Sequence, residues 1–266
     1  MSIANNSTRF PLPSQGVPAV ERALKLLELS AASNVGFTLS EVGQALGIAK
    51  SSSHRLIYTL LSHGYLQRTS STRRYILGTR ARDLASITEA DLQLGAVCSQ
   101  FAEELSRKVG LTVLTGVRRG AEGVVIHKAN SPKDVYPGAW IGHHFDLHCT
   151  AMGKALIAYM KEPELKELFQ QASLAPYTPF TLCSRRALWA DLAEVRARGF
   201  SLNAEESAIG GRGLAAPIFN HIGRVVASIC VRGSTALFPP GQVSSCAKEV
   251  ISAATKISRN LLEAMP

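Results

Sequence analysis

The first third of the chain carries apolar residues at helical spacing. A tail rich in Ser, Asn and Pro, residues 1–17, comes first and is expected to be flexible. Val20, Leu24 and Leu27 then fall on one face of a helix. We therefore expect an amphipathic helix over residues 18–31 that packs as scaffold.

Two short helices with clear start and stop signals follow. Thr38 and Glu41 have the spacing of a capping box, in which each side chain satisfies a free amide at a helix start. Gly47 supplies a left-handed stop, so this helix is predicted over 39–46. A second helix, over 50–63, begins three residues later. Two helices joined by a tight turn that contains glycine form a helix-turn-helix.

A predicted β-hairpin comes directly after these helices. Its strands are the β-prone stretches 65–67 and 74–77, and the polar, basic residues 69–73 form its tip. A hairpin in this position is a wing. Residues 18–78 are therefore predicted to be a winged helix-turn-helix domain.

The rest of the chain predicts a second domain. Residues 79–109 are mostly helical in pattern, and 79–94 are expected to be a linker helix that leads into a domain over 95–266. Strand candidates are 112–117, 124–128, 213–219 and 225–231. Helix candidates are 150–160, 162–171, 185–198 and 243–263. Strand hairpins on either side of a block of helices predict an antiparallel sheet with helices packed on it, an α+β domain.

The second helix of the helix-turn-helix has one apolar and one polar face. Its apolar face holds Leu56, Ile57, Leu60 and Leu61, and its opposite face holds Ser51, Arg55, Tyr58 and Ser62. The first turns of a recognition helix meet base edges in the major groove, which places Ser51, Ser52 and Arg55 for base contacts. Phosphate contacts are expected from Lys50 and Tyr58 on this helix and from Arg73 and Arg74 on the wing.

The distribution of charge favours double-stranded DNA as a partner. Lys and Arg together number 29 against 20 Asp and Glu, a net charge of +9. No acidic residue lies between Glu41 and Asp83, whereas basic residues recur through that segment. A solvated basic face and a protein that binds nucleic acid without regard to sequence are the alternatives to a regulator.

The cysteines and the N-terminus indicate a cytoplasmic protein. The five cysteines are widely spaced and form no C-x-x-C pair, so neither a disulfide framework nor a zinc clip is predicted. No apolar run is long enough for a signal peptide or a membrane span. We expect no membrane partner, and the absence of a P-loop or dinucleotide fingerprint indicates no cofactor.

One cluster allows two other functions. The cluster is His143, His144, Asp146, His148 and Cys149. All three residue types are zinc ligands, so a metal-responsive regulator is one alternative, although adjacent residues on an extended segment point to opposite faces. A cysteine-dependent enzyme that uses Cys149 with a nearby histidine is the other. We expect neither a metal site nor catalysis.

Several motifs in order resemble the IclR family of bacterial regulators. In the first domain these are AVERALKLL at 19–27, KSSSHRL at 50–56 and RYILG at 74–78. In the second they are LHCTAMGKAL at 147–156, AAPIF at 215–219 and GRVVA at 223–227. The resemblance covers nearly the whole chain after Pro18.

The resemblance implies a GAF-like or profilin-like effector domain, assembly as a homodimer or homotetramer, and a small organic acid that alters DNA occupancy. The matching pocket positions are Phe145, Ala151, Met152, Asn203, Gly211, Gly213, Cys230 and Arg232. Gly211 and Gly213 stand where larger side chains are expected, and Arg232 where a small polar residue is usual. Because Arg232 suits a carboxylate and Phe145 an apolar body, we expect an aromatic or similarly hydrophobic carboxylic acid. A surface ion pair of Arg232 with Asp or Glu is the alternative.

Overall fold

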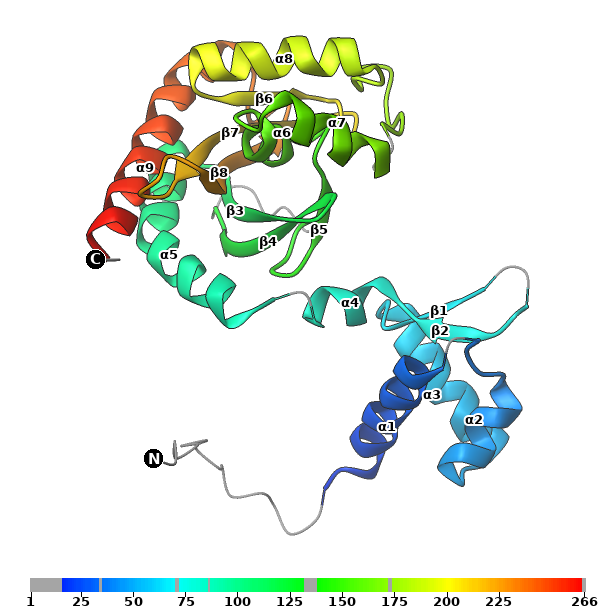
Figure 1. Cartoon of the computed structure of the whole chain (residues 1–266). Helices are drawn as coiled ribbons and strands as arrows, with labels where there is room; N and C mark the ends of the chain where they lie inside the picture. Colours follow the sequence, from blue (N-terminus) through cyan, green and yellow to red (C-terminus); the bar gives the residue numbers. More distant parts are fainter. Residues whose placement is uncertain are drawn as a thin grey trace, which may run out of the picture. The chain divides into compact units, whose positions relative to one another are not determined.

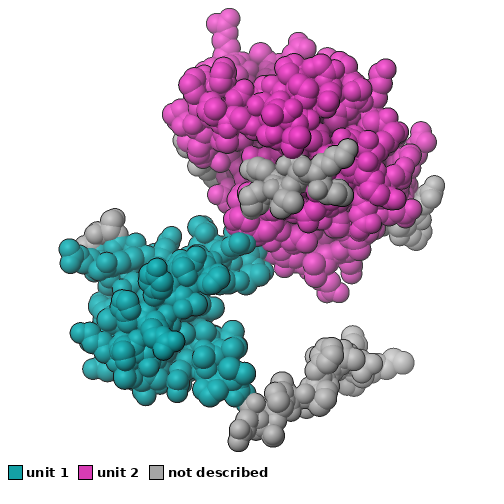
Figure 2. Space-filling view, turned by 180° about the vertical axis from the view of Figure 1, so that it is seen from behind, with its two compact units in different colours: residues 1–84 teal, residues 85–266 magenta. Residues whose placement is uncertain are grey.

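The structure is a computed structural model, and it describes residues 16–33, 35–69, 72–85, 87–131, 138–171 and 174–264. The chain divides into two compact units, residues 1–84 and 85–266, which Figure 2 shows in different colours. This division falls inside the expected linker. Most of the expected tail, residues 1–15, and two residues of the expected hairpin tip, 70 and 71, lie outside the described residues.

The first unit confirms the helix-turn-helix and its hairpin (Figure 1). Its elements are α1 (Pro18–Ala32), α2 (Leu39–Leu46), α3 (Lys50–Ser62), β1 (Leu66–Arg68) and β2 (Tyr75–Leu77). Thr38 and Glu41 form the predicted capping box at the start of α2, and Gly47 ends that helix with φ 62°. A small core of Leu26, Val42, Ile57, Leu60 and Leu66 holds the helices and the hairpin together.

The linker expected over 79–94 is not one helix. The structure has α4 (Thr79–Ala85) and then a separate helix, α5 (Glu89–Val109). Thr88 caps α5, because its hydroxyl accepts from the Asp91 amide while the Asp91 carboxylate accepts from the Thr88 amide. Arg119 also pairs with Asp91. This second capping box sets a helix start inside a stretch whose apolar pattern runs on without a break.

The second unit is built on a six-stranded antiparallel sheet in the order β5-β4-β3-β8-β7-β6. The strands are β3 (Thr112–Arg119), β4 (Glu122–Ala129), β5 (His144–Asp146), β6 (Ser201–Ala204), β7 (Gly211–Phe219) and β8 (Val225–Ser234). The helices besides α5 are α6 (Ala151–Ile157), α7 (Glu162–Gln171), α8 (Arg185–Arg198) and α9 (Val243–Ala264), with a short 3-10 turn, η1 (Pro240–Gln242). The two edge strands, β5 and β6, were not predicted.

Helices cover both faces of this sheet (Figure 1). On one face α5 and α9 lie side by side, and residues such as Val113, Val231 and Val250 form a core between them and the strands. On the other face α6, α7 and α8 cover a second core. Leu114 and Cys230 belong to this second core, because side chains alternate between faces along a strand.

Candidate functional site

The helix α3 presents the predicted DNA-reading face to solvent. Lys50, Ser51, Ser52 and Arg55 are exposed, and Tyr58 is 66% exposed, whereas Ile57 on the opposite face is 2% exposed. Among the residues that the structure describes, the side chains of Lys50 and Arg55 make no hydrogen bond or ion pair with the chain. The His54 and Tyr58 rings stack 6.5 Å apart on the same exposed side. This face is therefore able to meet a groove of DNA.

The two wing arginines predicted to bind phosphate have different surroundings. Arg73 is exposed and has a left-handed backbone with φ 54°. Arg74 instead donates from Nε and Nη2 to the Gly36 carbonyl at 3.1 and 3.0 Å, and from Nη2 to Glu41 Oε2 at 2.6 Å. Its guanidinium is bonded within the first unit, so Arg74 has a role in the fold, and its phosphate contact stays a prediction. Sequence reasoning missed this role, since residues 36 and 74 are far apart in the chain.

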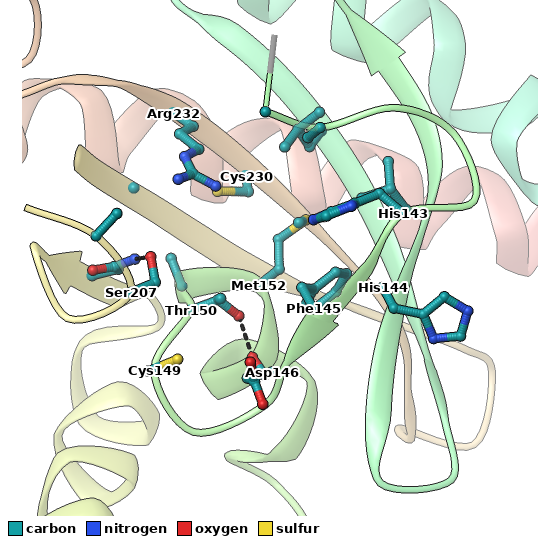
Figure 3. A pocket seen from close by; sticks show the side chains of 18 of the residues that line it. His143, His144, Phe145, Asp146, Cys149, Thr150, Met152, Ser207, Cys230 and Arg232 are labelled. Atoms are coloured by element: carbon teal, nitrogen blue, oxygen red, sulfur yellow. Dashed lines mark hydrogen bonds between the residues drawn. The ribbon is translucent and has the colours of Figure 1, made fainter. Parts of the chain in front are cut away.

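The second unit holds a cavity of about 350 Å³ between the sheet, the β5–α6 segment and the loop after β6 (Figure 3). Its walls combine apolar side chains with polar and charged ones. They include Leu114, His143, Phe145, Ala151, Met152, Tyr177, Asn203, Ser207, Gly213, Cys230 and Arg232. Seven of the eight predicted effector residues line this cavity. Gly211 does not, although a Cβ there would lie 3.8 Å from Arg232 Nη2.

Strand register explains why these residues come together. Asn203 pairs with Gly213, and Gly213 pairs with Arg232, so the three form one row across β6, β7 and β8. The next row on the same face, two residues along each strand, holds Ala215 and Cys230. The sheet therefore presents the polar side chains of Asn203 and Arg232 beside the small side chains of Ala215 and Cys230.

The Phe145 ring is placed by glycines on the neighbouring strands. It lies on Gly123 of β4, where any Cβ would overlap the ring, and a Cβ on Gly116 of β3 would lie 2.8 Å from Phe145 Cζ. Phe145 is 9% exposed and belongs to the second core. The glycines let the ring lie flat against the sheet as one apolar wall of the cavity.

The start of α6 is fixed to the sheet by two buried hydroxyls. Ser201 Oγ donates to the Ala151 carbonyl at 2.6 Å, and Ser228 Oγ donates to the Met152 carbonyl at 3.2 Å. These bonds place Ala151 and Met152 opposite the late strands. Two of the predicted pocket residues are therefore fixed to the sheet through their backbone carbonyls.

The thiols in the cavity are neutral at physiological pH. Burial raises the pKa of the Cys149 thiol, and also of the Cys230 thiol, to about 12. A nucleophilic cysteine needs its thiolate, so these surroundings do not suit the cysteine-enzyme alternative. Tyr177 donates to Asp146 Oδ2 at 2.9 Å, which raises the pKa of the phenol to about 12.

The histidine cluster is dispersed rather than convergent. His144 Nδ1 lies 2.8 Å from Glu122 Oε2, and His148 is buried with Nε2 3.1 Å from the Ala175 carbonyl. His143 packs edge-to-face on Trp140, with ring centroids 4.4 Å apart. In the described part of the chain, no three His, Cys, Asp or Glu side chains are grouped to hold a metal ion.

Among the helices of the described residues, none is both long and apolar enough to cross a bilayer.

Comparisons with known proteins agree with this architecture. The model of the bacterial transcriptional regulator IclR C-terminal domain matches residues 86–259, and that of the IclR helix-turn-helix domain matches residues 19–70. The HTH-type transcriptional regulator XynR of Escherichia coli (strain K12) is 31% identical over 92% of this chain and 97% of its own length.

Solved structures give the same result. The Thermotoga maritima IclR crystal structure has a TM-score of 0.66 at 26% identity, over 91% of this chain and 98% of its own. An IclR homologue from Microbacterium hydrocarbonoxydans, complexed with 4-hydroxybenzoate, has a TM-score of 0.61 at 21% identity, over 91% of this chain and 98% of its own. At this identity the likeness shows a shared fold and nothing more. The matched families and relatives are transcription regulators rather than enzymes. The chain belongs to the IclR family and is a DNA-binding transcription regulator of that type.

Proposed function

We propose that this regulator is controlled by a carboxylic acid with an aromatic or similarly hydrophobic body, bound in the cavity of the second unit. The observation that carries the proposal is Arg232, a half-buried cation at the margin of a cavity whose walls include Phe145 and Met152. A guanidinium binds a carboxylate through parallel N–H bonds, and apolar walls favour an apolar ligand body.

The size of the cavity supports this ligand class. About 350 Å³ lies at the small end of the range for ligand pockets, which suits a compact acid. Cys149 and Cys230 contribute no charge, because both thiols stay protonated. The homologue complexed with 4-hydroxybenzoate shares this fold. An aromatic acid is consistent with that ligand, but the proposal rests on the side chains of this chain.

For the first unit, we propose that Ser51, Ser52 and Arg55 contact DNA bases. We propose that Lys50, Tyr58 and Arg73 contact phosphates, and that the protein acts in the cytoplasm. Their exposure on one side of α3 and on the wing supports these roles. A single winged helix offers few contacts, so a homodimer or homotetramer that reads paired half-sites gives the affinity an operator needs.

The test is a thermal-shift screen of the full chain with benzoate, phenylacetate, hexanoate and pyruvate. An acid present at about 100 times its dissociation constant should add about 2.7 kcal/mol of stability. We expect benzoate or phenylacetate to raise the melting temperature of the parent and of Arg224→Gln, an exposed arginine away from the cavity. Arg232→Gln should lose the shift. Equal shifts in both variants would contradict the proposed site.

A further inference from the structure

We propose that the acid's carboxylate is held at two points, by the Arg232 guanidinium and by the Ser207 hydroxyl, above the position that Gly213 leaves without a side chain. This inference rests on the proposed function and deepens it. Ser207 lies in the loop between β6 and β7, where neither periodicity nor spacing draws attention to it.

The hydrogen bonds of Asn203 fix the direction in which Ser207 donates. Asn203 Oδ1 accepts from the Glu206 backbone N–H at 2.8 Å, so the other end of the amide is its NH2 group. That group donates to Ser207 Oγ at 2.7 Å. Ser207 Oγ is therefore an acceptor toward Asn203, and its own hydrogen points elsewhere. Among the described residues this hydroxyl has no acceptor, and Ser207 lines the cavity.

The loop that carries Ser207 is held in place from several sides. Lys154 Nζ lies 2.6 Å from Glu206 Oε1. The Thr181 hydroxyl donates to the Glu206 carbonyl at 2.6 Å, and the Thr178 hydroxyl donates to the Glu205 carbonyl at 2.7 Å. A donor held this firmly loses little conformational entropy when it binds an anion.

Gly213 leaves the space that the carboxylate would occupy. It lies between Asn203 and Arg232 in the same row of the sheet. A Cβ at this position would lie 3.5 Å from Ala151 Cβ and 3.6 Å from Cys230 Sγ, which is ordinary van der Waals contact. Because Gly213 has no side chain, the row between Asn203 and Arg232 carries no side chain at this position.

This arrangement orients the rest of the ligand. Figure 3 shows Arg232 and Ser207 on one side of the hollow, with Phe145 and His143 on the other. An acid bound at the first side would direct its body over Met152 toward the Phe145 ring. An ammonium group next to the carboxylate would lie close to the Arg232 cation. We therefore infer a monocarboxylic acid with a flat apolar body, and not an α-amino acid.

The experiment measures the affinity of the full chain for benzoate and for benzamide, its uncharged isostere, by titration calorimetry. Ser207→Ala should bind benzoate about tenfold more weakly, because one hydrogen bond to a charged group is lost. Ser207→Thr, which keeps the hydroxyl, should recover most of the affinity. The matched control is Ser245→Ala on α9, which is exposed and bonds only to the Gln242 carbonyl.

The variant Asn203→Asp gives a second, independent test of the two-point site. A carboxylate at this position would accept the Ser207 hydrogen and turn it away from the ligand, so the preference for benzoate over benzamide should fall at least as far as in Ser207→Ala. If the parent binds benzoate and the Ser207 and Asn203 variants bind it equally well, the two-point site is wrong and the proposed function stands. If the parent binds neither benzoate nor phenylacetate, the carboxylic acid effector and this inference both fail.

Discussion

Arg74, at the base of the wing, donates to Glu41 Oε2 at 2.6 Å, and Glu41 is the residue that closes the capping box of α2. The same guanidinium bonds the Gly36 carbonyl. One side chain therefore joins the hairpin to the first helix of the helix-turn-helix. The wing is positioned relative to the DNA-reading helix by this contact and by the shared core.

Replacing Arg74 should loosen α2. Arg74→Met loses the bonds to Glu41 and Gly36, and since the pair is partly exposed we expect only a small loss of unfolding free energy. Hydrogen exchange of the α2 amides should speed up. The control is Arg73→Met, which should leave exchange unchanged and weaken binding to all DNA sequences. Equal exchange in both variants would refute the assignment.

Acid should weaken the same contact. The backbone N–H of Thr38, and then Arg74, lower the pKa of Glu41 below its ordinary value of 4.5. A carboxyl group with a lowered folded-state pKa stabilises the fold fully above its unfolded pKa, and this contribution is lost as pH falls through the folded value. Protection of the α2 amides should therefore fall below about pH 4.5 in the parent, and less steeply in Glu41→Gln. Parallel pH profiles would contradict this.

Arg55 is the sharpest test of base readout. It is exposed, two residues before the buried Ile57, on the face of α3 that is free of the core. Arg55→Ala should lose about 1 to 3 kcal/mol of binding to the operator while its binding to unrelated DNA changes little. Anisotropy titrations at one salt concentration measure both. An unchanged operator affinity would remove Arg55 from the readout.

Lys154 should prove essential to the second unit. It is 1% exposed, and its Nζ lies 2.6 Å from Glu206 Oε1 and 2.9 Å from Asp191 Oδ2. Lys154→Met leaves the buried Glu206 carboxylate without its ion-pair partner and should cost about 3 kcal/mol of unfolding free energy, measured by urea denaturation.

Two further variants check this interpretation of Lys154. The double variant Lys154→Met with Glu206→Gln should recover part of the loss, because one of the charges is gone. The exposed residue Lys161 supplies the control, Lys161→Met, which should cost little. A double variant less stable than Lys154→Met alone would show that the ion pair is not the cause.

The sequence predicts the long elements of this fold well and its tertiary contacts poorly. Apolar periodicity and caps place α1, α2, α3 and α9 within about two residues. The edge strands β5 and β6 are only three and four residues long, too short for a periodic pattern. The break before α5 depends on Thr88 and Asp91, a capping box that the continuous apolar pattern obscures.

The same limit applies to the candidate site. Strand alternation and the family resemblance indicate Arg232, Cys230 and Gly213, which share one face of the late strands. Ser207 depends instead on a loop conformation and on the Asn203 amide 2.7 Å away, and nothing local in the sequence reports that contact. Arg74 is a second case, because its bonds to the Gly36 carbonyl and to Glu41 join residues far apart in the sequence, and nothing local predicts them.

The most direct test of a ligand-controlled regulator is a titration of the full chain against DNA from beside its own gene, by anisotropy, with and without benzoate. We predict a preference for that DNA over a scrambled duplex, and a midpoint that benzoate moves in the parent. Arg232→Gln should bind the same DNA equally well without benzoate and show no shift with it. Equal affinity for both duplexes, unchanged by benzoate in the parent, would contradict the account.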